Sequence, residues 1–132
     1  MIRNFMVPKY VVPAIAGAGA AFFLFFGLWP LLDPMNFYEE VADFPPYNEH
    51  FLHDVGAFQI GLGLTLAIAL FWRSDALLVA LIGSVVAAAL HVWAHVVDED
   101  QGGSSGDTIF LGILAVLLLA GAAWQWTRSK AV

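Results

Sequence analysis

The chain has 132 residues, of which 61% are hydrophobic and only 12% are charged, whereas a soluble domain carries about 25% charged and about 45–50% apolar residues. This composition excludes an ordinary soluble domain and indicates an integral membrane protein. The 11 acidic residues against 5 basic ones leave no basic surface for nucleic acid. Because cysteine is absent, disulfides, thiolate metal sites and iron–sulfur clusters are excluded, and any metal ion would need nitrogen and oxygen ligands.

Four apolar runs are long enough to cross a bilayer, whose hydrocarbon core takes about 20 helical residues. They cover Tyr10–Trp29, His53–Trp72, Ala76–His95 and Ile109–Trp126. Irregular backbone is not tolerated against lipid, so each run is expected to be a helix. The sequence therefore predicts an all-α membrane protein, with residues 1–132 forming a single domain that is a four-helix transmembrane bundle.

The charges give this bundle an orientation. All five basic residues fall on one side of a four-span arrangement, namely Arg3, Lys9, Arg73, Arg128 and Lys130. All the acidic residues except Asp75 fall on the other side. The positive-inside rule then places both termini in the cytoplasm. We predict a multi-pass protein of the cytoplasmic membrane whose histidines and acidic residues face the outside.

The first outer loop contains the pattern of a short amphipathic helix. Asp33 can cap such a helix, and Phe37, Val41 and Phe44 then recur on one helical face. The proline at position 45 should end it. We expect this helix to lie in the outer membrane interface.

All four histidines lie at the outer ends of the second and third spans. His50 and His53 are three residues apart, and His91 and His95 are four apart. Both spacings place two side chains on one face of a helix, which is how helices present two ligands to one metal ion. Ionisable groups at membrane depth are candidates for function because their exposure to lipid is costly.

Small residues predict which way the histidine pairs point. Only three residues separate the second and third spans, so these helices should be antiparallel neighbours. Inward from the first histidine pair, successive turns carry Ala57 and Gly61, and inward from the second they carry Ala88 and Ser84. Because small residues mark close approach of membrane helices, we expect the two pairs to face each other.

The main functional hypothesis is therefore an outward-facing site that binds a divalent transition metal, since imidazole and carboxylate ligands suit Zn, Cu, Fe and Mn. The expected ligands are His53, His91 and His95, with Asp54, Asp98, Glu49 and His50 completing or orienting the set.

Several alternatives remain open. The histidines could hold a haem between the two spans, or titrate as a pH sensor, since the ordinary histidine pKa is about 6.5. They could also be incidental, in a non-catalytic accessory subunit that packs its Gly and Ala faces against a larger membrane complex or against further copies of itself. No nucleophile or anion clamp specifies an enzymatic reaction.

Two segments carry a resemblance to a known family. They are FGLWPLLDP at residues 26–34, followed by Phe37, and DVGAFQIGLGL at residues 54–64. In these segments the chain resembles the small four-helix DoxX-like membrane proteins. The resemblance implies a four-helix bundle and, as for some members, a small subunit of a sulfur-linked or quinone-linked oxidoreductase assembly. Related proteins often carry an arginine near the start of the second span, where this chain has His53 and Asp54, and the resemblance supplies no catalytic residue.

Overall fold

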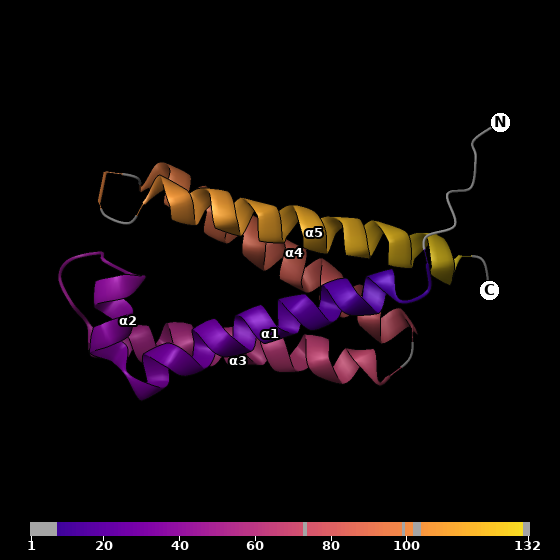
Figure 1. Cartoon of the computed structure of the whole chain (residues 1–132), viewed down its shortest axis with the longest axis horizontal. Coiled ribbons are helices and arrows are strands. Elements are labelled where there is room, and N and C mark those ends of the chain that lie inside the picture. The colour runs from indigo at the N-terminus through magenta and orange to yellow at the C-terminus, as the bar shows by residue number, and fades with distance from the viewer. Residues whose placement is uncertain (1–7, 73, 99, 102–103, 131–132) are drawn as a thin grey trace.

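The computed structural model describes residues 8–72, 74–98, 100–101 and 104–130. Within these ranges the chain forms five helices and no strand: α1 (Val11–Leu32), α2 (Pro34–Glu40), α3 (Glu49–Leu70), α4 (Ser74–Val97) and α5 (Ser105–Ser129). All but α2 are long and apolar enough to cross a membrane, judged by length and composition. The four predicted spans are thus confirmed as long apolar helices, and Figure 1 shows α2 at one end of them.

Polar caps start α3 and α5 about one turn before the apolar runs begin. The Asn48 side chain accepts a hydrogen bond from the backbone N–H of Phe51 at 3.1 Å. Ser104 and Asp107 form a capping box at the start of α5. Each cap satisfies backbone donors that have no partner within the helix, so the helices extend beyond the stretches that hydrophobicity alone marks.

The short helix α2 follows Asp33 as predicted, and the Asp33 carboxylate accepts a hydrogen bond from the backbone N–H of Asn36 at 3.2 Å. Its predicted end is wrong, because the helix stops at Glu40 and Phe44 lies in the following loop. Phe44 precedes Pro45, and a residue before proline is disfavoured in the helical conformation.

Glycines bring α1 and α3 into close contact. A Cβ added at Gly56 would lie 2.7 Å from the carbonyl oxygen of Gly27, and one added at Gly63 would lie 3.0 Å from the backbone nitrogen of Leu24. Gly56 and Gly63 are therefore packing residues. Gly61 is not, because a Cβ there would meet nothing within 4 Å.

The helices pair as α1 with α3 and as α4 with α5, while α3 and α4 share a smaller contact. On α4 the predicted stripe of small residues is confirmed, since Ser84 and Ala88 are buried. On α3 it is wrong, since Ala57 and Gly61 are exposed. The face of α3 that carries Gly56 and Gly63 packs against α1 instead. The prediction that α3 turns its histidines toward α4 therefore loses its basis.

The two helix pairs cross closely near the chain termini and diverge toward α2 (Figure 1). At the crossing of α1 and α5, a Cβ at Gly19 would lie 2.9 Å from a side-chain carbon of Leu118, and one at Gly121 would lie 3.0 Å from a side-chain carbon of α1. Toward α2 the same interface holds Phe22 and Phe110, whose ring centroids are 5.7 Å apart. Small residues allow close approach, whereas large rings hold helices apart.

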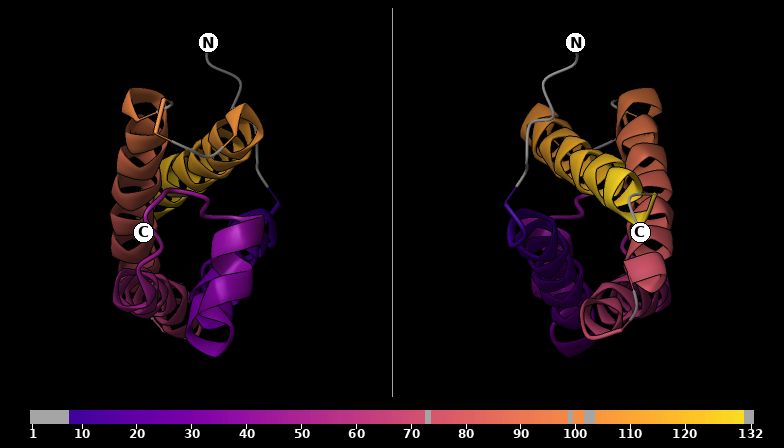
Figure 2. Two further views of the ribbon diagram at one scale, coloured as in Figure 1. Left: turned by 90° about the vertical axis from the view of Figure 1, so that its left-hand side faces the viewer. Right: turned by 90° about the vertical axis from the view of Figure 1, so that its right-hand side faces the viewer.

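Seen end-on, the four long helices form a ring in the order α1, α3, α4, α5, and each contacts the two beside it (Figure 2). At the end near the termini, the Arg128 guanidinium donates hydrogen bonds to the carbonyl oxygens of Pro8 at 2.9 Å and Lys9 at 3.3 Å. These bonds join the start of α1 to the end of α5.

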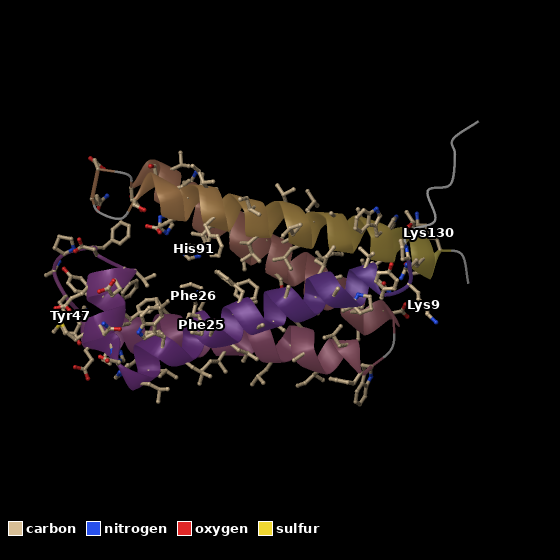
Figure 3. The ribbon with its side chains drawn as sticks, viewed as in Figure 1. Lys9, Phe25, Phe26, Tyr47, His91 and Lys130 are labelled. Atoms are coloured by element: carbon tan, nitrogen blue, oxygen red, sulfur yellow. The ribbon has the colours of Figure 1, made fainter. Side chains whose placement is uncertain are left out.

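Charge separates between the two ends of the bundle among the described residues. The end with Lys9, Arg128 and Lys130 is called the basic end, and Figure 3 shows Lys9 and Lys130 there. The opposite end, called the acidic end, carries all the described carboxylates except Asp75: Asp33, Glu39, Glu40, Asp43, Glu49, Asp54, Asp98, Asp100 and Asp107. Arg3, Arg73 and Glu99 lie outside the described residues.

Candidate functional site

A cavity of about 760 Å³ lies between the two helix pairs at the acidic end, and all five helices contribute to its lining. Binding sites for small molecules commonly have volumes of about 300–1,000 Å³. Aromatic side chains make up much of the lining, namely Phe22, Phe23, Phe26, Trp29, Phe37, Tyr38, Phe44, Phe51, Phe58 and Phe110. The cavity therefore has the size and apolar character of a ligand site.

The rings on α1 and α2 pack against one another and hold this part of the wall in place. Phe22 and Phe26 have ring centroids 4.6 Å apart, and Trp29 packs edge-on against Phe37 at 5.6 Å. The indole Nε1 of Trp29 donates a hydrogen bond to the Asn36 side-chain oxygen at 3.0 Å. Edge-to-face pairs and a bonded indole fix ring orientation, so this wall is formed before any ligand enters.

His91 and His95 lie on the α4 wall of the same cavity. Their ring centroids are 5.0 Å apart, and Figure 3 shows His91 directed toward the space in which Phe26 also lies. The ring of Phe44 packs edge-on against His95 at 5.8 Å, which brings the loop after α2 onto α4. A neutral imidazole has one donor and one acceptor nitrogen, so the pair offers polar contacts in a largely apolar wall.

The histidines of α3 lie elsewhere. Neither His50 nor His53 is among the residues that line the cavity. The Nε2 atom of His50 lies 3.6 Å from an Asp54 carboxylate oxygen, in a pair whose side chains are 87% and 57% exposed. Asp54 lies three residues before Ala57, so the two residues share one face of α3. Both are exposed, because this face does not pack against another helix.

The predicted carboxylates are divided in the same way. Asp98 lines the cavity and accepts a hydrogen bond from the Gln101 side-chain amide at 3.0 Å. Glu49 does not line it, and accepts a hydrogen bond from the Tyr47 hydroxyl at 3.5 Å. Desolvation, together with the nearby Glu49 carboxylate, raises the pKa of the Tyr47 phenol above its ordinary value.

Among the residues that the structure describes, no group of three or more His, Asp or Glu side chains is arranged to hold a metal ion. Of the seven expected ligands, His91, His95 and Asp98 share the cavity wall, and the four on α3 lie outside the lining. The packing of α3 explains this division. Gly56 and Gly63 hold one face of α3 against α1, and in this orientation the predicted ligands on α3 point away from the cavity.

Other lining residues were not anticipated from the sequence. Gln59, Glu40 and Asp107 line the cavity, as do Phe22, Phe23 and Phe26 of α1. The run of aromatic residues in the first span was the available signal, since Phe22, Phe23 and Phe26 from that run line the cavity.

Comparison of the chain with protein-family models, with curated proteins and with solved structures finds no match. The resemblance to DoxX-like proteins stays a prediction, and the functional argument depends on the geometry of the cavity.

Proposed function

We propose that this chain is an integral membrane protein that binds an amphiphilic small molecule in the cavity between its two helix pairs. The observation that carries the proposal is the cavity itself, with its volume of about 760 Å³ and its lining of aromatic rings around two histidines. If the basic end faces the cytoplasm, as the positive-inside rule favours, the ligand binds near the outer surface of the membrane.

The two kinds of lining residue have different tasks in this proposal. The apolar part of the ligand lies against rings such as Phe22, Phe26 and Phe110, which gain from burial of apolar surface. Its polar group lies near His91 and His95, whose ring nitrogens accept or donate hydrogen bonds. Few polar groups in an apolar cavity fix a ligand's orientation.

Tryptophan quenching by 4-bromobenzyl alcohol, a neutral aromatic molecule with one hydroxyl group, tests the proposal. Trp29 lines the cavity, whereas Trp93 on α4 is 63% exposed outside it. Two variants of the full chain are needed, each keeping one of these tryptophans and replacing the other four with phenylalanine. We expect saturable quenching of Trp29 and quenching of Trp93 that only rises in proportion to the probe dissolved in lipid.

A pair of matched substitutions identifies the cavity as the binding site. Ala87→Phe places a ring in the lining, whereas Ala89→Phe, two residues along the same helix, places it on the exposed face. Ala87→Phe should abolish the saturable quenching and Ala89→Phe should preserve it. If Trp29 and Trp93 are quenched alike, or if both substitutions leave quenching unchanged, the proposal is wrong.

A transition-metal ion is the second candidate ligand, and the adjacent rings of His91 and His95, whose centroids are 5.0 Å apart, favour it. Metal analysis of the purified chain tests it. Stoichiometric Zn, Cu, Fe or Mn that is lost in a His91→Ala, His95→Ala variant, but kept when His50 and His53 are replaced, would support this candidate. A metal-free wild-type chain would refute it.

A haem held between α3 and α4 is not proposed, since no histidine of α3 lines the cavity to serve as the second axial ligand. The predicted accessory-subunit role is compatible with the proposal, because a subunit can contribute a ligand site to a larger complex.

A further inference from the structure

We infer that the ligand of this cavity is an amphiphilic organic cation. This inference depends on the proposed binding function and adds the charge of the ligand to it. Glu40, Asp98 and Asp107 line the cavity, and neither lysine nor arginine occurs in its lining among the described residues. These three carboxylates, called the carboxylate rim, give the lining a formal charge of about −3 with the histidines neutral.

The three residues of the carboxylate rim come from three separate segments of the chain. Glu40 ends α2, Asp98 follows α4, and Asp107 lies in the first turn of α5. The hydrogen bonds to Asp98 and Asp107 come from uncharged donors, the Gln101 amide at 3.0 Å and the Ser104 backbone and hydroxyl at 2.9 Å. These donors carry no formal charge, so they do not cancel the charge of the two carboxylates.

The surroundings reinforce the negative potential. The other carboxylates of the acidic end have the same sign, whereas the described basic side chains Lys9, Arg128 and Lys130 lie at the opposite end of the bundle. An apolar wall with a low dielectric constant strengthens the field that such charges produce inside a cleft. A cationic ligand is therefore attracted, and an anionic one is repelled.

The aromatic lining selects the same sign of charge. The faces of aromatic rings carry partial negative charge and attract cations, with tryptophan the strongest of them. Trp29, Tyr38 and Phe44 line the cavity together with Glu40. An organic cation near these residues gains both contacts, while an organic anion of the same size gains burial alone.

The size of the cavity favours an occupant larger than a bare inorganic cation. A volume of about 760 Å³ with a mostly apolar lining leaves a small hydrated ion without contacts on most sides. An occupant that satisfies the whole lining has a bulky apolar or aromatic body and a positive charge close to the carboxylate rim.

Tetraphenylphosphonium and tetraphenylborate provide a direct test, since the two ions share a shape and carry opposite charges. Binding to the full chain is measured by titration calorimetry in nanodiscs of zwitterionic phosphatidylcholine, with partition into empty nanodiscs subtracted. We expect the cation to bind at least about tenfold more tightly than the anion at low salt. This preference should fall as ionic strength rises, because salt screens partly exposed charges.

Two pairs of variants locate the charge. Glu40→Gln and Asp98→Asn should each weaken binding of the cation about threefold or more. Glu39→Gln and Asp100→Asn remove carboxylates of the same kind that do not line the cavity, and should leave binding unchanged. Glu40 is exposed at the end of a short helix, so its variant keeps the test available if Asp98→Asn fails to fold.

Equal binding of the two ions, tighter binding of the anion, or cation binding that ignores both rim substitutions would overturn the inference. If 4-bromobenzyl alcohol still quenches Trp29 saturably and Ala87→Phe still prevents it, the cavity function stands and only the charge assignment fails. If neither the neutral probe nor either ion binds, both proposals fail.

Discussion

The packing of α3 decides which residues reach the cavity, and the substitution Gly56→Ala tests that packing directly. The added Cβ would lie 2.7 Å from the Gly27 carbonyl oxygen and 3.1 Å from side-chain carbons of Pro30 and Leu31. The nearest atom belongs to the backbone, so α1 and α3 must move apart along their contact. Such overpacking costs about 1–3 kcal/mol, and the gain in helix propensity returns at most about 1 kcal/mol. With the full propensity gain, we expect a net loss of up to about 2 kcal/mol in the free energy of unfolding.

Gly61→Ala is the matched control on the same helix, because a Cβ there would meet nothing within 4 Å. Only the propensity gain applies, so stability should be unchanged or higher by up to about 1 kcal/mol. The assay is unfolding by sodium dodecyl sulfate added to micelles of a mild detergent, followed by helical circular dichroism. If the Gly56→Ala chain unfolds at the same or a higher fraction of dodecyl sulfate than the Gly61→Ala chain, the other face of α3 is the packed one. The argument that separates the α3 histidines from the cavity would then be refuted.

Three further predictions concern the acidic end. Ser104→Ala removes a side-chain acceptor of the α5 capping box, so it should cost about 1 kcal/mol and raise amide hydrogen exchange in the first turn of α5; unchanged exchange there would contradict this. Phe44→Ala removes the ring that packs on His95, so 4-bromobenzyl alcohol should leave the cavity faster in stopped-flow quenching than it does from the wild-type chain. The raised pKa of Tyr47 predicts ionisation at higher pH than an ordinary tyrosine, measured as the ultraviolet difference between the chain and its Tyr47→Phe variant, and Glu49→Gln should lower that pKa. Because the folded-state pKa is raised, the stabilisation from this phenol is present below the ordinary pKa of about 10 and is lost as pH rises through the folded-state value.

The four long helices were predictable because length and hydrophobicity alone determine whether a segment can cross a bilayer. The packed face of α3 was not predictable in the same way. Its opposite faces both carry small residues, Gly56 with Gly63 on one and Ala57 with Gly61 on the other. A helix that is apolar all round has no polar face to orient it. The packed face of α3 is determined by the close contact of Gly56 with Gly27 on α1. The sequence of α3 alone does not predict that contact.

The α4 half of the site was predictable because its local signals agree. Ser84 and Ala88 are buried small residues, and His91 and His95 follow them two turns later on the same face. The volume in front of these histidines could not be deduced from that face. It arises because α1 and α5 touch through Gly19 and diverge beyond it, which is a property of two helices together.

The cavity also restricts its own occupant on energetic grounds. Its lining combines aromatic rings with carboxylates, and an occupant that contacts only one of these two groups leaves the other unsatisfied. Water satisfies the carboxylate rim but gains little against the rings of Phe22 and Phe110, while a lipid chain satisfies the rings and leaves the rim without a counter-charge. An amphiphilic cation satisfies both parts at once, because its charge lies at the rim while its apolar body fills the space between the helix pairs.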